Sequence, residues 1–161
     1  MWDDNYFYMA AMVKDDEVAS MHSGEFIWKD DCIEFYVNSQ DDGLMWGNQK
    51  DFQIGFSPGK PGEEIRTWAW FQKQDPRKDQ SVAAVCKPTA DGYLVEAEKS
   101  WKFLGLTPAE GLVFGASPCL HDIDRKDGSE GRLIWYFEDV SSAKGKQLGQ
   151  FELFKSPDIS P

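Results

Sequence analysis

The sequence has little cysteine and histidine, and it has no long apolar run. Its three cysteines form no C-x-x-C pair, so they imply neither a disulfide framework nor a cysteine zinc site; we expect buried free thiols, with one chance pair as the alternative. A Gly-x-Ser-x-Gly segment and a glycine-rich phosphate loop are also absent. No stretch approaches the roughly eighteen apolar residues of a membrane span, and the start of the chain does not resemble an export signal.

Positive charge is scarce as well. The chain has 17 lysines and arginines against 28 aspartates and glutamates, which gives a formal net charge of −11. A field of this sign repels phosphate backbones and anionic lipid headgroups. Nucleic acid and membranes are therefore poor candidates as partners, whereas neutral ligands such as sugars, and cations, remain suitable.

Short aromatic and β-branched runs, separated by Gly, Pro, Asn and Asp, predict many short strands. We expect strands at residues 6–13, 32–38, 52–57, 66–72, 81–86, 92–98, 113–118, 132–136 and 150–154. Apolar and polar residues alternate within 33–37 and 93–97, as in strands with one face on a core.

Regular helix is nearly absent from this pattern. A single helical turn is expected at residues 101–104, stopped by Gly105. The expected fold is all-β, a two-sheet antiparallel β-sandwich of jelly-roll-like form. One domain should occupy residues 1–155, with 156–161 as a linker or tail.

Residues 26–37, Phe-Ile-Trp-Lys-Asp-Asp-Cys-Ile-Glu-Phe-Tyr-Val, combine a large indole with acidic side chains. Trp28 precedes an acidic pair, and Glu34 lies on an alternating strand, so a stacking face would lie beside hydrogen-bond acceptors. Sugars need this combination, because their CH faces pack on aromatic rings while their hydroxyls need directional partners. The alternative is that Trp28 is a core residue and Glu34 points to solvent.

Further motifs accompany this segment in a fixed order. They are Trp2-Asp-Asp-Asn-Tyr-Phe-Tyr8, Val13-Lys-Asp-Asp16, Gly92-Tyr-Leu-Val-Glu-Ala97 with Trp101, Val113-Phe-Gly115, His121-Asp-Ile-Asp124, Leu133-Ile-Trp135 and Leu148-Gly-Gln-Phe-Glu-Leu153. In this order the chain resembles the family 9 carbohydrate-binding modules, which are related to DOMON-like sandwiches. The resemblance implies a jelly-roll-like sandwich, structural calcium, and sugar chain ends bound between two tryptophans. Because the family normally has additional strands at the start, we expect this chain to be a fragment.

The binding residues of the family carry over in part. Trp28 matches the first sandwiching tryptophan, and Glu34 matches the carboxylate that accepts sugar hydroxyls. Gln53 stands where the family has an arginine, and Cys119 stands where it has a glutamine. Ala143 replaces the second tryptophan, so one wall of the implied slot is missing.

Other tryptophans offer replacement aromatic surface. Trp46 lies in the loop after the strand at 32–38, and Trp68 and Trp70 are two apart on a strand, hence on one face. Such a pair is suited to a flat sugar platform. The alternative is that these side chains fill the core or cover its edge.

Acidic residues gather in two places. Around a Gly turn we expect calcium ligands at Asp122, Asp124, Asp127 and Glu130. Oxygen donors at this density suit calcium, although their spacing is not that of an EF-hand, and a solvated acidic turn is the alternative. If residues 13–17 and 26–34 lie side by side, a second cluster would contain Asp15, Asp16, Asp30 and Asp31.

The expected function is non-catalytic binding of oligosaccharide or polysaccharide ends, such as those of xylan or cellulose. The resemblance implies an appendage of a larger protein that is secreted, periplasmic or on the cell surface. Enzyme chemistry is not indicated, because carboxylates are plentiful but nothing in their spacing points to a glycosidase pair. One alternative is a haem-binding DOMON-type redox domain with Met21, His22 or His121 as axial ligands. The other is an interaction or scaffold domain that has lost the sugar site.

Overall fold

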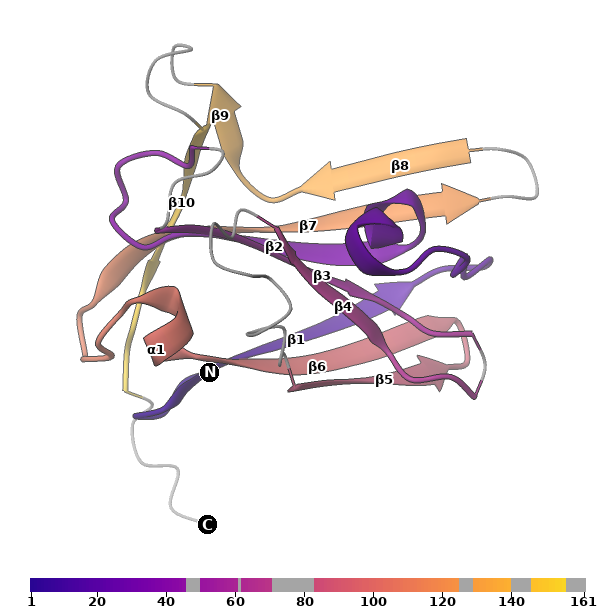
Figure 1. Ribbon diagram of the computed structural model, residues 1–161, viewed down its shortest axis with the longest axis horizontal. Helices are drawn as coiled ribbons and strands as arrows, with labels where there is room; N and C mark the ends of the chain where they lie inside the picture. Colours follow the sequence, from indigo (N-terminus) through magenta and orange to yellow (C-terminus); the bar gives the residue numbers. More distant parts are fainter. Residues whose placement is uncertain (46–49, 61, 71–82, 125–128, 140–145, 156–161) are drawn as a thin grey trace.

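Two antiparallel β-sheets pack face to face (Figure 1). The computed structural model describes residues 1–45, 50–60, 62–70, 83–124, 129–139 and 146–155. The strands are β1 (Tyr6–Lys14), β2 (Cys32–Asn38), β3 (Asp51–Ser57), β4 (Arg66–Trp70), β5 (Ala83–Thr89), β6 (Gly92–Ser100), β7 (Val113–Asp124), β8 (Ser129–Ile134), β9 (Phe137–Asp139) and β10 (Lys146–Glu152). The expected all-β antiparallel sandwich is confirmed.

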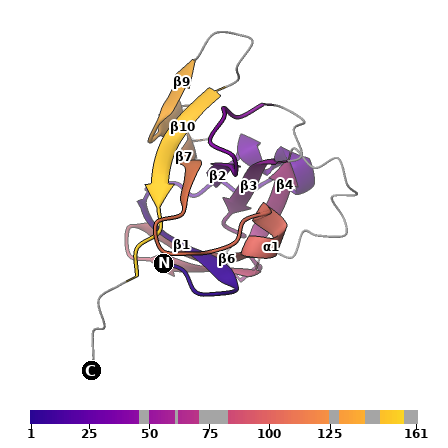
Figure 2. The same ribbon diagram turned by 90° about the vertical axis from the view of Figure 1, so that its left-hand side faces the viewer.

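The two sheets differ in size. The smaller has three strands in the order β1-β6-β5, and the larger has seven, in the order β4-β3-β2-β7-β10-β9 with β8 paired to β7. Figure 2 shows β1 and β6 as a layer beneath β2 and β3. Strand β2 lies inside the larger sheet, between β3 and β7. We call the side of the larger sheet that is turned away from the smaller sheet the outer face.

Apolar side chains between the sheets form the core. Phe35 and Val37 of β2 are buried there, and the Phe35 ring centroid lies 5.6 Å from that of Phe7 on β1. Side chains alternate across a strand. Glu34 and Tyr36, on the same strand, therefore point to the outer face.

Two short helices flank the sandwich, one at each end in Figure 1. In α1 (Trp101–Leu104) the Ser100 side chain accepts a hydrogen bond from the backbone N–H of Phe103, and Gly105 ends the turn at φ 65°, as expected. The 3₁₀-helix η1 (Gly24–Lys29) packs on β3 and β4. The sequence did not predict η1, because six residues give too short a helical period to recognise.

Five strands differ clearly from the sequence prediction. They are β5 (expected at 81–86), β7 (expected at 113–118), β8 (expected at 132–136), β10 (expected at 150–154) and β9, which was not expected. Residues 71–82 and the expected tail at 156–161 lie outside the described residues. The shifts occur at strand ends and edge strands, where polar residues continue the pairing without an apolar signal.

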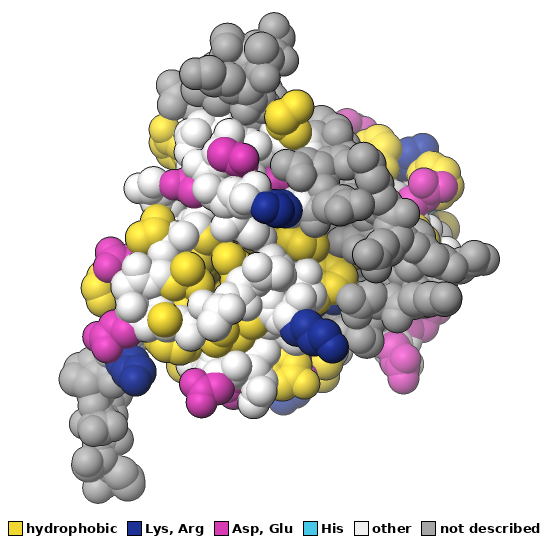
Figure 3. All heavy atoms as spheres, turned by 60° about the vertical axis from the view of Figure 1, so that its left-hand side comes forward, with side chains coloured by type: hydrophobic (Ala, Val, Ile, Leu, Met, Phe, Trp, Pro, Cys, Tyr) yellow, Lys and Arg dark blue, Asp and Glu magenta, His cyan; other side chains and the backbone are white. Residues whose placement is uncertain are grey.

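Charged side chains are dispersed on one face of the molecule. On the face drawn in Figure 3, Asp and Glu side chains lie scattered among uncharged and apolar ones, with basic side chains between them. Among the described residues, no helix has the length and apolar character needed to cross a bilayer.

Gly55 on β3 allows η1 and Trp70 to pack closely on the outer face. An added Cβ there would lie 2.6 Å from Cη2 of Trp70 and 3.1 Å from Cδ1 of Ile27. We therefore expect Gly55→Ala to lower the free energy of unfolding by about 1–3 kcal/mol in urea denaturation. Gly131→Ala is the matched control, because its Cβ meets no atom closer than 3.5 Å. Equal losses in both variants would contradict this account.

Candidate functional site

Polar and aromatic side chains form rows across the outer face. Residues directly opposite each other in antiparallel strands share a face, so the register defines these rows. One row contains Trp70, Gln53, Tyr36 and Ser117. The next contains Trp68, Gly55, Glu34, Cys119 and Ile134. Glu34 and Gln53, two residues predicted for sugar binding, therefore lie in neighbouring rows of one face.

Trp28 lies on η1, beside these rows. Its side chain is 44% exposed, whereas its neighbour Ile27 is fully buried against the sheet at Gly55. The ammonium of Lys29 lies 5.5 Å from the Trp28 ring centroid. Trp28 is therefore not a core residue, and its indole is accessible at the edge of the outer face.

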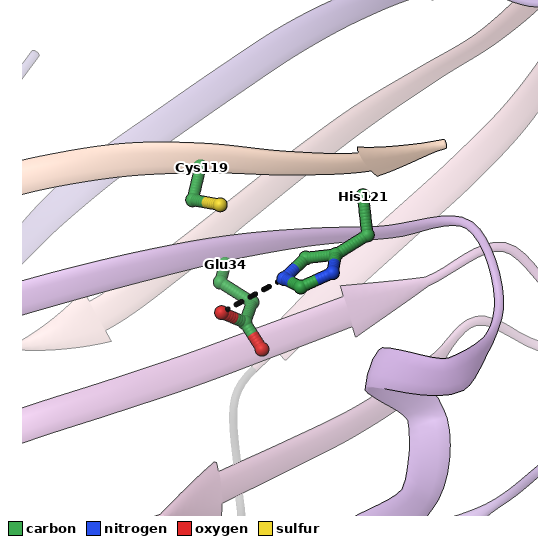
Figure 4. Close-up of side chains that lie close together, drawn as sticks. All are labelled: Glu34, Cys119 and His121. Carbon is green, nitrogen blue, oxygen red and sulfur yellow. Dashed lines mark ion pairs between the residues drawn. The ribbon is translucent and has the colours of Figure 1, made fainter. Parts of the chain in front are cut away.

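Glu34 is almost completely buried and is surrounded by donors. Its Oε2 accepts a hydrogen bond of 2.5 Å from the Tyr36 hydroxyl. The same oxygen lies 3.2 Å from Nε2 of His121 and 3.9 Å from Nη2 of Arg132. Figure 4 shows the Glu34 and His121 side chains directed toward each other. The His121 contact has an ion-pair distance without hydrogen-bond alignment. Glu34 is thus an anchored carboxylate and does not point freely to solvent.

Arg132 and Tyr36 complete the network around this carboxylate. Arg132 donates from Nε to Sγ of Cys119 at 3.3 Å and from Nη2 to the Tyr36 hydroxyl at 2.9 Å. Gln53 donates from Nε2 to the same hydroxyl at 3.2 Å. The sequence did not single out Arg132 or Tyr36. Only the register of β8 on β7, which sets Arg132 opposite His121, could have found the arginine.

The network lowers the pKa of Glu34 and raises the pKa of His121. Burial alone would raise the pKa of Glu34, but the contacts with His121 and Tyr36 outweigh burial and lower it. Burial alone would lower the pKa of His121, but its contacts with Cys119 and Glu34 outweigh burial and raise the pKa to about 9. At neutral pH the outer face therefore holds one anionic and two cationic side chains at this point.

The remaining predicted aromatic residues divide into two groups. Trp68 and Trp70 share the outer face as expected, but they are half-buried, with Gly24 of η1 near Trp68 and a hydrogen bond of 3.2 Å from Trp70 Nε1 to the carbonyl of Glu25. Both indoles thus hold η1 on the sheet. Trp46 and Ala143 lie outside the described residues.

The acidic residues meet in a combination that the sequence did not predict. Carboxylate oxygens of Asp15, Asp122 and Asp124 lie within 4.8 Å of one another. Burial raises the pKa of Asp122, and the negative charges of Asp15 and Asp124 add to this effect. The observed cluster therefore combines Asp15 from one expected acidic cluster with Asp122 and Asp124 from the other. It lies where the segment after β1 meets the end of β7.

The other predicted metal ligands lie elsewhere. Glu130 is opposite Ile123 in the β7–β8 register, so it faces away from Asp122 and Asp124. Asp127 lies outside the described residues. Asp30 accepts hydrogen bonds from the backbone N–H groups of Met21 and His22.

Asp31 lies close to this acidic cluster. It accepts hydrogen bonds from the backbone N–H groups of Ala19 and Ile123, which ties the segment before η1 to β7. Burial raises the pKa of Asp31 to about 7; these backbone bonds oppose that rise, and the charge of Asp15 adds to it. The described structure thus places a fourth carboxylate beside the three that converge.

The histidines proposed as haem ligands are both paired with carboxylates. Nδ1 of His22 lies 2.9 Å from Asp30, and His121 lies against Glu34. Met21 is 62% exposed at the surface. These placements favour structural and ion-pairing roles for both rings.

Comparison with known proteins finds a family model and a curated relative that match most of this chain. The family model described as "Carbohydrate family 9 binding domain-like" matches residues 1–155. Endo-1,4-beta-xylanase A of Thermotoga maritima is 23% identical over 137 residues, which cover 84% of this chain and 12% of that protein. The chain thus spans about an eighth of the length of this curated relative.

Two solved structures share the fold. Both are described as a carbohydrate binding module family 9 (CBM9) from Caldicellulosiruptor kristjanssonii, one in complex with cellotriose and the other with glucose. Each is 21% identical and covers all of this chain, with TM-scores of 0.70 and 0.71. This chain covers 75% and 78% of theirs. At 21% identity, this similarity shows a shared fold and nothing beyond it.

The Glu34–His121 contact predicts a pH-dependent stability. Because its pKa is raised to about 9, His121 stabilises the fold fully below its unfolded pKa of about 6.5, and this contribution is lost as pH rises through 9. We expect His121→Gln to destabilise the protein by about 2–3 kcal/mol at pH 6 and by much less at pH 9.5. Urea denaturation of both proteins at each pH measures this difference. A constant or growing difference would contradict the ion pair.

Proposed function

Because the chain belongs to the carbohydrate family 9 binding domain-like family, we propose that it is a non-catalytic domain that binds a terminal sugar residue at the outer face of its larger sheet. In this proposal one sugar ring stacks on Trp28, while Glu34 and Gln53 fix the orientation of its hydroxyls. The family to which the chain belongs is one of binding domains, and this agrees with the absence of catalytic signatures from the sequence.

The observation that carries the proposal is an accessible indole beside buried polar side chains. Trp28 is 44% exposed, whereas Glu34 and Gln53 are 1% and 6% exposed. The Oε1 atom of Gln53 has no hydrogen-bond partner within the described structure, although it is buried. Buried polar groups normally have partners, so this acceptor is available to a sugar hydroxyl.

The chemistry of such a site suits recognition of one ring. An indole face packs on the CH groups of a sugar, and fixed acceptors and donors select the direction of its hydroxyls. Affinity should be modest, because each hydroxyl must lose water before it pairs. The rigidity of the site comes from the sheet, since Tyr36 and Arg132 hold Glu34 in place.

We further propose that the domain is an appendage of a larger extracellular or cell-surface protein that acts on plant-type polysaccharides such as xylan or cellulose. Support comes from the xylanase relative, of which the matched region is only 12%. The structural neighbours were solved with cellotriose and glucose. The net charge of −11 is compatible with neutral polysaccharide and unfavourable for nucleic acid.

Calcium is the proposed structural metal, held by Asp15, Asp122 and Asp124. All three offer oxygen donors, which calcium prefers, and these oxygens lie within 4.8 Å of one another. Like charges at this separation repel, and a divalent cation would remove that cost. Bound calcium would join the segment after β1 to the end of β7.

Trp28→Ala should abolish sugar binding while the protein stays folded. The indole supplies the stacking surface and is not part of the core. Isothermal titration with glucose, xylose, cello-oligosaccharides and xylo-oligosaccharides measures the loss, and circular dichroism checks the fold. Phe26→Ala is the matched control, because Phe26 is 48% exposed on the same helix.

Two outcomes would overturn this assignment. Loss of the fold in Trp28→Ala would make the indole structural and the site misplaced. A wild-type domain that stays folded and binds none of the sugars would favour the alternative of a scaffold domain without the sugar site.

Calcium should raise the melting temperature. We expect a rise of about 2–5 °C in calorimetry when chelator is replaced by millimolar CaCl₂, because the ion binds the folded state. Asp122→Asn should remove most of this rise. Glu130→Gln, which changes an exposed carboxylate on the opposite face of β8, should retain it. Equal melting temperatures with calcium and with chelator would contradict the metal site.

A further inference from the structure

Three side chains with different metal-binding groups converge on the outer face. The carboxylate of Glu34, the thiol of Cys119 and a ring nitrogen of His121 lie within 4.8 Å of one another (Figure 4). Glu34 is opposite Cys119 in the pairing of β2 with β7, and His121 follows two residues later on β7, so all three share one face. Sequence spacing could not reveal this set, because Glu34 comes from a different strand, far away along the chain.

The spacing of these groups is close to that around a tetrahedral zinc ion. Zinc binds sulfur at about 2.3 Å and nitrogen or oxygen at about 2.0–2.2 Å, so its ligand atoms lie about 3.3–3.6 Å from one another. Oε2 of Glu34 lies 3.2 Å from Nε2 of His121, which already matches. Since the three groups lie within 4.8 Å of one another, side-chain adjustments of about 1 Å would close the set around an ion.

The histidine nitrogen that faces Glu34 lacks a hydrogen bond. Nε2 of His121 is buried, and among the described residues it has no hydrogen-bond partner, although it lies at ion-pair distance from Glu34. Buried polar atoms normally have partners. This nitrogen is therefore available as a metal ligand, and the observation is independent of the convergence of the three side chains.

Neighbouring donors hold two of these ligands in place. The Tyr36 hydroxyl donates to Oε2 of Glu34 at 2.5 Å, and Nε of Arg132 donates to Sγ of Cys119 at 3.3 Å. Such hydrogen bonds around a metal site orient the ligands and tune their basicity. A carboxylate and a thiolate together balance the two charges of a divalent cation, and the added charge of Arg132 falls in a chain of net charge −11.

We propose that Glu34, Cys119 and His121 form a zinc site on the outer face, with a fourth position left for an oxygen ligand such as water. Thiolate and imidazole suit zinc, whereas calcium takes oxygen ligands, so this site differs in kind from the proposed calcium site. Zinc replaces the protons of the thiol and the imidazole when it binds. The inference goes beyond sugar binding, and because both sites use Glu34, the zinc site is tested without sugar.

Cobalt is the probe, because Co²⁺ accepts the same tetrahedral ligands as zinc and absorbs light when a thiolate binds it. The whole chain, without a histidine tag, is titrated with CoCl₂ at about pH 7.5, where free imidazole is mostly neutral. Millimolar calcium is present to occupy carboxylate sites. We expect a thiolate-to-cobalt charge-transfer band that saturates at one equivalent. Zinc added afterwards should abolish the band, because thiolate ligands select zinc.

Variants assign the band to this site. Cys119→Ser should abolish it, and His121→Gln should weaken cobalt binding by at least about tenfold, the smallest loss expected when even an outer-shell partner is removed. Cys86→Ser is the matched control, because it removes a half-buried thiol from β5 of the smaller sheet, and its titration should equal that of the wild type. Circular dichroism checks the fold of each variant, and His121→Gln carries the test if Cys119→Ser does not fold.

The outcomes separate this inference from the proposed function. Cobalt that binds without a thiolate band would be held by carboxylates elsewhere, and a band that survives in Cys119→Ser would come from Cys32 or Cys86. Either result overturns the zinc site, as does a wild-type domain that binds neither cobalt nor zinc. None of these results bears on sugar binding, so the Trp28 site stands or falls by its own titration.

Discussion

The buried carboxylate of Glu34 constrains the outer face more than any other single group. Alternation along β2 sends Phe35 into the core and Glu34 to the opposite side, where it is 1% exposed. An unpaired charge at that depth costs several kcal/mol. His121 from β7 and Arg132 from β8 offset this cost, so the register of three strands is coupled to one ion-pair network.

The fold could be predicted because its signals are local. Alternation in β2 and β6 defines which side of each strand is buried, and Gly105 marks the end of α1. Elements without such signals were missed. The helix η1 is too short for a period, and β8 continues through Glu130 and Gly131, whose polar character on an edge strand resembles a loop.

The candidate site was predictable only in part. Trp28 and Glu34 lie six residues apart in one recognisable segment, so sequence alone placed them together. Arg132 and Tyr36 are 96 residues apart, and only the pairing of β2, β7 and β8 brings them into contact. The acidic cluster follows the same rule. Glu130 is paired with Ile123 and not with Asp122, and this register of β8 on β7 makes it face away from Asp122.

Tryptophan indole signals in ¹H–¹⁵N NMR spectra test the central claim, a sugar site at the outer face, most directly. During titration with a sugar that binds, the account predicts that the Trp28 indole signal shifts with saturation. The Trp101 indole, 2% exposed in the core and bonded to the carbonyl of Asp3, should stay fixed. Saturable shifts at Trp101 or Trp2 with an unchanged Trp28 signal would place the ligand at the other end of the sandwich and contradict the account.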